Sequence, residues 1–150
     1  MRLALLFALS VLFVMCASTK TYTLDELPDE QLLFSSGGGF TGEWNDYLLL
    51  PNGQLFTRRR VIRELPMREL EGLDPKVTKD LFDTFEKQKF AELGYNEPGN
   101  MTYVIEHVAA GDTAKVVWGG GNLKPTEELR TYWRRLMGEV RDKEPKPVAE

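Results

Sequence analysis

The sequence has little of the residue types that most metal sites and nucleophilic enzymes need. Its 150 residues include one cysteine, Cys16, and one histidine, His107. A disulfide bond within the chain needs two cysteines, so none can form. Zinc sites and Ser/His or Cys/His catalysis lose most of their usual ligands and bases. We therefore expect no bound metal or cofactor, and no enzyme of those classes.

The sequence also lacks an excess of positive charge and a long hydrophobic run. Lysine and arginine number 19 against 23 acidic residues, a formal net charge of −4, which gives no electrostatic footprint for nucleic acid or anionic lipid headgroups. The one local exception, Arg58 to Arg60 with Arg63, we interpret as a solvated strand edge. The apolar segment at residues 3–15 is too short to cross a bilayer as a helix and has the length of a signal-peptide core. Residues 1–15 are therefore predicted to be a signal peptide.

Cys16 follows this apolar segment directly, and small polar residues come after it. Residues 12–16 (LFVMC) resemble a bacterial lipobox, in which signal peptidase cuts before a cysteine that then carries lipid. Met15 departs from the usual Gly, Ala or Ser before the cysteine, as in the relaxed boxes of Bacteroidota. The resemblance implies that Cys16 carries acyl chains such as palmitate and anchors the protein in the cell envelope, outside the cytoplasmic membrane. The alternative is an ordinary secretory signal cut near Ala17 or Ser18, which gives a secreted or periplasmic protein.

The chain beyond the signal peptide is long enough for one domain with a hydrophobic core and too short for two. Residues 16–30 are polar after Cys16 and are predicted to be a lipidated tether. A single domain is predicted over residues 31–141. Residues 142–150 contain two prolines and mostly charged residues, which predicts a disordered tail.

Hydrophobic periodicity predicts an α+β domain. A helix is expected to begin at Asp74 and Pro75, which suit its first turn, and to end near Gly94. A second helix is expected from the apolar repeat that runs from Leu129 to Val140. The alternating, turn-bounded segments predict about five antiparallel strands, at residues 31–36, 43–50, 54–58, 101–108 and 114–118. The order is three strands, a helix, two strands and a helix, with both helices packed on the sheet.

Residues 37–42, which we call the glycine loop, match the pattern G-x-G-x-x-G of dinucleotide-binding folds. That pattern requires a helix immediately afterwards, whereas residues 44–50 are rich in β-formers. Two other interpretations remain open. The glycines supply a bulged hairpin connection in which Phe40 folds back onto the core, or the loop presents Phe40 to a pocket of a partner.

Residues 34–42 (FSSGGGFTG) resemble the serine-glycine-glycine-phenylalanine-x-glycine signature of emfourin-type inhibitors of thermolysin-like metalloproteases. This chain has one extra glycine, a lipoprotein leader and a longer C-terminal helix. The resemblance implies a compact α+β domain that blocks a peptidase. The whole pattern, including residues 94–101, also resembles small Bacteroidota lipoproteins. The partner-binding surface is predicted to consist of Ser36, Gly37, Gly38, Gly39, Phe40, Thr41, Gly42 and Trp118.

Catalytic residue patterns are weak. His107 is in phase with the apolar residues of its strand and is interpreted as a half-buried strand residue. Acids that could pair for carboxylate-dependent hydrolysis are Glu43, Asp46, Glu97 and Glu106, although their spacing does not place two across a cleft. We therefore predict an envelope protein without catalytic activity that binds a protein partner and acts as a peptidase inhibitor. The alternatives are a structural subunit of an envelope complex and a carboxylate-dependent hydrolase.

Overall fold

The computed structural model describes residues 20–61, 63 and 65–146. Cys16 and the predicted signal peptide lie outside the described residues. The described part forms an α+β domain, which confirms the predicted class. Its elements are β1 (Gln31–Gly38), β2 (Glu43–Leu49), β3 (Leu55–Arg60), β4 (Arg68–Leu70), α1 (Pro75–Lys87), a 3-10 turn (Phe90–Leu93), β5 (Met101–Ala109), β6 (Asp112–Trp118) and α2 (Glu127–Val140).

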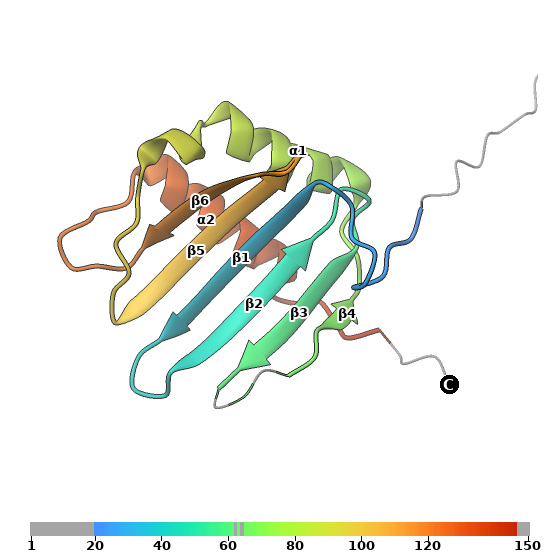
Figure 1. Cartoon of the computed structure of the whole chain (residues 1–150), viewed down its shortest axis with the longest axis horizontal. Coiled ribbons are helices and arrows are strands. Elements are labelled where there is room, and N and C mark those ends of the chain that lie inside the picture. Colours follow the sequence, from blue (N-terminus) through green and yellow to red (C-terminus); the bar gives the residue numbers. More distant parts are fainter. Residues whose placement is uncertain (1–19, 62, 64, 147–150) are drawn as a thin grey trace, which may run out of the picture.

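The sheet is antiparallel and has six strands in the order β4-β3-β2-β1-β5-β6 (Figure 1). The prediction of about five strands missed one strand, β4. This strand has three residues, too few to show an alternating pattern, and it pairs with residues 55–57 of β3. Its position is decided by that pairing and not by local sequence.

Both α-helices pack on one face of the sheet and leave the other face uncovered by helices (Figure 1). The main core lies between the helices and the sheet, where large apolar side chains from all layers are fully buried. Its most buried members include Leu32, Phe34, Leu49, Ile105 and Val116 from strands, and Leu81, Phe85, Leu129 and Leu136 from helices. Cross-strand partners share a face, so the register Leu33↔Leu48 and Ser35↔Asp46 places these four residues together on the uncovered face.

Capping residues define the starts of the helices. The Asp74 carboxylate accepts hydrogen bonds from the backbone N–H of Lys76 and Val77, at 2.8 and 3.3 Å, as predicted. Thr126 caps α2 by accepting from the N–H of Leu129. Gly94 does not end α1 itself, because the chain leaves the helix at Lys87 and makes a 3-10 turn before Gly94 adopts a left-handed conformation.

Residues 20–30, within the predicted tether, contact the domain. The backbone N–H of Tyr22 donates to Gln54 Oε1 at 2.7 Å, and Gln54 Nε2 donates back to the Tyr22 carbonyl. The side chains of Tyr22 and Leu27 pack against a small apolar cluster on the uncovered face, formed by Leu48, Leu50 and Phe56. This part of the N-terminal segment is therefore docked beside the β2–β3 turn.

Residues 144–146, within the predicted tail, lie along β4. The backbone N–H of Glu71 donates to the Glu144 carbonyl and that of Lys146 to the Glu69 carbonyl, both at 2.9 Å. The C-terminal segment thus covers the edge of β4, where unpaired backbone groups would otherwise face solvent. Within the described residues, no helix is long and apolar enough to cross a membrane.

Candidate functional site

Three glycine-containing segments meet at one end of the sheet. The glycine loop joins β1 to β2, residues 97–100 lead into β5, and residues 119–121 follow β6 (Figure 1). The N–H of Gly39 donates to the Asn100 carbonyl at 2.6 Å, and the N–H of Gly120 donates to the Glu97 carbonyl at 3.0 Å. Residues 97–100 thus lie between the glycine loop and residues 119–121 and form hydrogen bonds with both.

The close approach of these segments requires glycine at several positions, among them Gly38, Gly99 and Gly119. A Cβ atom on Gly38 would overlap the Asn100 carbonyl, and one on Gly119 would overlap the Met101 carbonyl. Both glycines also have a positive φ, of 114° and 144°. A residue with a side chain cannot adopt this backbone without strain, so the glycines hold the loops against each other.

Phe40 extends from the glycine loop into solvent, and its side chain is fully exposed. The expectation that it folds back onto the core is therefore wrong. Gly39 and Gly42, on either side, have left-handed φ values of 68° and 61°, and these turn the loop beyond the end of the sheet. The side chain of Met101, which is 44% exposed, lies beside the glycine loop. Its Sδ atom would be 3.3 Å from a Cβ atom built on Gly39.

Trp118 is the one predicted partner-binding residue that lies apart from the loop surface. Its side chain is buried, with 5% of its surface exposed, and it lies on the face that the helices cover. Its ring stacks on Tyr103 at a centroid distance of 5.4 Å and meets Trp133 edge-on at 5.5 Å. Trp118 therefore does not share one exposed face with Phe40.

The remaining predicted loop residues lie at the base of the hairpin. Ser36 pairs with Tyr103 across β1 and β5. Gly37 is buried under the indole of Trp44, with which it pairs across β1 and β2. The Thr41 hydroxyl accepts from the N–H of Glu43 at 3.4 Å. These residues shape the hairpin that carries Phe40.

An ion-pair cluster occupies the uncovered face of the sheet. Asp46, 4% exposed, accepts from Arg58 Nε at 2.7 Å and from Arg60 Nε and Nη2 at 2.5 and 2.8 Å. The Arg60 guanidinium also lies 5.2 Å from the centre of the Trp44 ring. Burial tends to raise the pKa of Asp46, but the hydrogen bonds from Arg60, Arg58 and Ser35 outweigh it and hold that pKa below its ordinary value. Arg58 and Arg60 thus point onto the sheet face instead of forming a solvated edge.

Three of the four acids proposed for hydrolysis, Glu43, Asp46 and Glu106, are engaged in ion pairs. Asp46 and Glu106 line one cavity of about 320 Å³ on the uncovered face, together with Lys115, which pairs with Glu106. A hydrogen bond from Arg59 holds the pKa of Glu43 below its ordinary value. A general acid at neutral pH needs a raised pKa, so the arrangement favours structural ion pairs over acid–base catalysis.

His107 is more buried than the half-buried strand residue that was predicted, with 4% of its surface exposed. Its ring lies edge-on to Phe82 and Phe85. Its Nε2 is 3.2 Å from Glu30 and its Nδ1 is 3.2 Å from Glu86, so it connects the N-terminal segment to α1. Among the described residues, no three His, Cys, Asp or Glu side chains group as metal ligands.

Sequence reasoning missed Met101, Tyr103 and Trp133 as neighbours of the predicted site. The helical period placed Trp133 toward the sheet, and Tyr103 lies on the same face as its pairing partner Trp118. Their contact depends on how α2 crosses the sheet, which periodicity does not give. No family model and no curated protein sequence matches the chain in comparisons with known proteins.

Proposed function

We propose that this chain is a non-catalytic binding module, held in the bacterial cell envelope by a lipid on Cys16, and that its glycine loop contacts a protein partner. The observation that carries the proposal is the fully exposed Phe40 at the tip of a hairpin whose base is fixed by β1, β2 and the Gly39–Asn100 hydrogen bond. Loops on a rigid scaffold commonly carry binding. Aromatic side chains that insert into a partner contribute much of an interface's binding energy.

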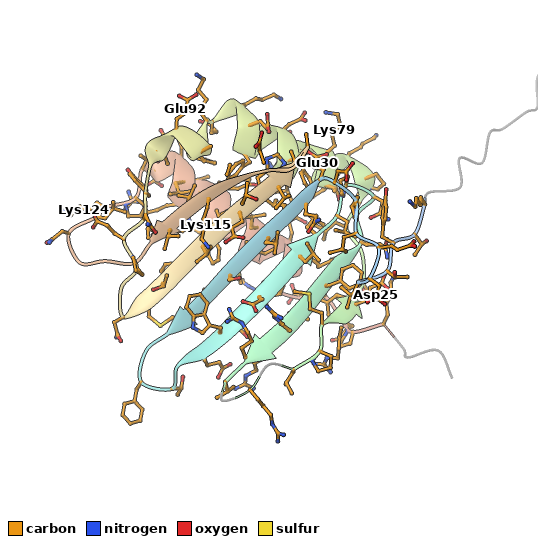
Figure 2. The ribbon with its side chains drawn as sticks, in the orientation of Figure 1. Asp25, Glu30, Lys79, Glu92, Lys115 and Lys124 are labelled. Atoms are coloured by element: carbon orange, nitrogen blue, oxygen red, sulfur yellow. The ribbon has the colours of Figure 1, made fainter. Side chains whose placement is uncertain are left out.

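The position of the N-terminal segment supports an anchored module. The Lys20 carbonyl accepts from Asn52 in the β2–β3 turn, at the opposite end of the sheet from the glycine loop. In Figure 2, Asp25 on the docked segment lies at the β4 side of the sheet. Four residues of chain from Cys16 to Lys20 reach at most about 14 Å, and β1 alone spans roughly 25 Å. A lipid on Cys16 would thus keep the β2–β3 turn near the membrane and direct Phe40 away from it.

We further propose a peptidase as the partner, on the resemblance of residues 34–42 to emfourin-type inhibitors. An inhibitor needs a projecting loop on a stable frame, and the hairpin provides one. The direct test is inhibition of purified thermolysin by the chain from Lys20 onward. This chain contains every described residue, the whole core and both segments that dock on the sheet. Inhibition that Phe40→Ser abolishes would support a peptidase partner, and no inhibition of thermolysin-like enzymes would contradict it.

A capture experiment tests the binding surface independently of the partner's class. The same chain is immobilised and exposed to envelope extract, beside Phe40→Ser and a control, Leu65→Ser. Leu65 is also an exposed apolar residue, with 50% exposure, and lies between β3 and β4. We expect a partner retained by the wild type and the control and weakened at least about tenfold by Phe40→Ser, as loss of an aromatic hot spot implies. A partner retained equally by all three would contradict the role of the loop.

Lipidation is tested by labelling cells with radioactive palmitate. The full chain is expected to incorporate label and fractionate with membranes, and Cys16→Ser is expected to do neither. A labelled Cys16→Ser variant would refute the anchor. An unlabelled wild type in a soluble envelope fraction would favour the alternative of an ordinary secretory signal.

A further inference from the structure

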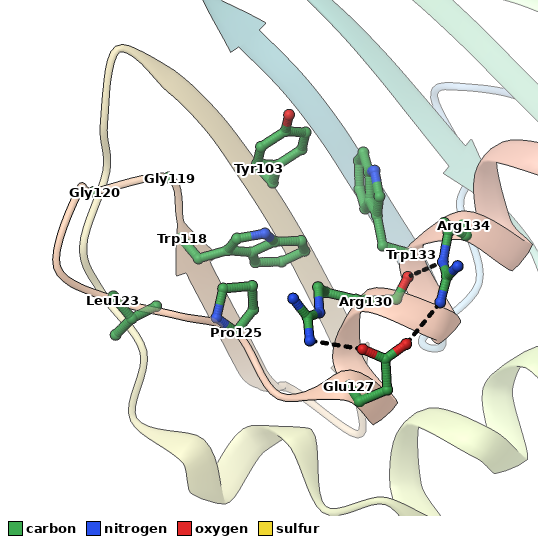
Figure 3. A pocket seen from close by; sticks show the side chains of 10 residues that line it. All are labelled: Tyr103, Trp118, Gly119, Gly120, Leu123, Pro125, Glu127, Arg130, Trp133 and Arg134. Atoms are coloured by element: carbon green, nitrogen blue, oxygen red, sulfur yellow. Dashed lines mark hydrogen bonds and ion pairs between the residues drawn. The ribbon is translucent and has the colours of Figure 1, made fainter.

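A cavity of about 580 Å³ opens between the end of β6 and the first two turns of α2 (Figure 3). Its volume is in the range of small-molecule sites, about 300–1,000 Å³. It lies on the helix-covered side of the sheet, separate from the exposed surface of Phe40. Strand β5, the segment after β6 and helix α2 each contribute to its lining.

Three aromatic rings form one wall of this cavity. Tyr103 and Trp118 stack nearly parallel, at 18° between their planes, and Trp133 lies edge-on to both, at centroid distances of 5.3 and 5.5 Å. Leu123 and Pro125 add apolar surface from the loop (Figure 3). This wall favours a flat apolar group, which can stack on or meet aromatic faces.

The polar groups of the three rings make no hydrogen bond to any described residue. Among the described residues, the Thr78 hydroxyl is the one buried side-chain polar atom without a partner. The Tyr103 hydroxyl and the indole N–H groups of Trp118 and Trp133 are therefore not fully buried. Each therefore reaches solvent. The three polar groups are therefore accessible, in addition to the apolar surface of the rings.

The rim of the cavity carries more positive than negative charge. Glu127 is shared by two arginines of α2, with Arg130 Nη2 at 2.6 Å from one carboxylate oxygen and Arg134 Nη2 at 2.8 Å from the other (Figure 3). Two guanidinium groups against one carboxylate leave one net positive charge. The charges of Glu97 and Lys124, on neighbouring segments, are opposite and cancel, so they do not change this excess. Guanidinium groups bind carboxylate, phosphate and sulfonate oxygens through paired N–H donors.

We propose that this cavity binds a small organic anion, with its flat apolar body against Tyr103, Trp118 and Trp133 and its acidic group at Arg130 and Arg134. Glu127 competes with the ligand for the two arginines. The proposal goes beyond the partner-binding role of the glycine loop and does not depend on it, because Phe40 is not part of the cavity.

Two dyes with nearly the same apolar body test the proposal. Anilinonaphthalenesulfonate carries an anionic group, and N-phenylnaphthylamine is neutral. The chain from Lys20 onward carries Trp44→Phe, which leaves only Trp118 and Trp133, so energy transfer from tryptophan to dye reports binding at the cavity. We expect saturable binding of the anionic dye with one site.

Charge variants then separate an anion site from general apolar binding. Arg130→Gln with Arg134→Gln is expected to lower the affinity for the anionic dye about tenfold, because charged hydrogen bonds are lost. The affinity for the neutral dye is expected to fall less than about twofold. Arg63→Gln with Arg141→Gln removes the same charge elsewhere and is expected to change neither. Glu127→Gln is expected to raise the affinity for the anionic dye. A merely structural role of Glu127 would not give this increase.

Folding of each variant is checked by circular dichroism, and little change is expected for the cavity variants because the side chains of Glu127, Arg130 and Arg134 are more than half exposed. The proposal is overturned by an absence of saturable energy transfer, by an equal loss for both dyes, or by an equal loss in the distal double variant. Phe40→Ser is expected to leave dye binding unchanged. A failure of the glycine-loop proposal is therefore distinguishable from a failure of this one.

Discussion

Replacing Asp46 with asparagine removes the carboxylate that Arg58 and Arg60 share on the uncovered face of the sheet. The carboxylate receives three hydrogen bonds from the two guanidinium groups, at 2.5 to 2.8 Å. Asparagine keeps the shape of the side chain but has no charge, and its amide N–H₂ faces groups that are themselves donors. Arg58 and Arg60 would then lose the carboxylate that they share.

The cost follows from burial on each side of the pair. Breaking a fully buried ion pair by removing one partner costs about 3–5 kcal/mol. The side chains of Arg58 and Arg60 are each 30% exposed, so water regains part of their solvation, and we expect Asp46→Asn to cost about 2 kcal/mol. For the domain at residues 20–146, an unfolding entropy of about 2.1 cal/mol/K per residue converts this into a fall of roughly 7 °C in the thermal midpoint.

Thermal unfolding at pH 7, followed by circular dichroism, measures the effect. The matched control is Glu43→Gln, which removes the ion pair with Arg59, whose side chain is 62% exposed. We expect the control to leave the midpoint unchanged, because exposed pairs contribute little. If Asp46→Asn and Glu43→Gln shift the midpoint equally, burial does not set the strength of the Asp46 cluster.

The wild-type domain is expected to lose this contribution in acid, because the pKa of folded Asp46 lies below its unfolded value near 3.8. The stabilisation is present above that pH and disappears as the pH falls through the folded pKa, so wild-type and Asp46→Asn midpoints measured from pH 7 to pH 2 should converge; a constant gap would contradict this. Gly38→Ala is expected to cost about 2 kcal/mol or more in urea unfolding, since its φ is 114° and a neighbouring carbonyl blocks its Cβ, whereas Gly121→Ala, with open space around it, should stay within about 0.5 kcal/mol. Tyr132→Phe removes the buried hydrogen bond to the Leu81 carbonyl, 3.0 Å long, and should cost about 1 kcal/mol by the same measurement. A neutral Tyr132→Phe would show that the carbonyl finds another donor.

Local signals predicted most of the secondary structure. The repeat from Leu129 to Val140 gave the C-terminal helix, because 3.6-residue periodicity needs no knowledge of the partner surface. Asp74 capped α1 as expected, since capping is decided within one turn. β4 was missed because three residues are too few to show an alternating pattern. It is a strand because it pairs with β3, and local sequence does not specify that pairing.

The candidate sites were predicted less completely than the fold. The composition of the glycine loop indicated an unusual hairpin, and its glycines do adopt left-handed backbone. The direction of Phe40 did not follow, because both directions are compatible with the same residues. Trp118 was expected at an exposed face, yet its strand register and α2 bury it among aromatic rings.

The sequence by itself determined which residues alternate along each strand, where the helices begin and how the charges are distributed, since these depend on neighbours within a few positions. Tertiary structure decided what those residues meet. The register Asp46↔Arg58 made Arg58 and Arg60, from an apparently solvated arginine run, the partners of a buried carboxylate. The packing of α2 on the sheet brought Trp133, Arg130 and Arg134 to the end of β6 and made a cavity there. Contacts between distant segments depend on register and on the packing of whole elements, which no local pattern specifies.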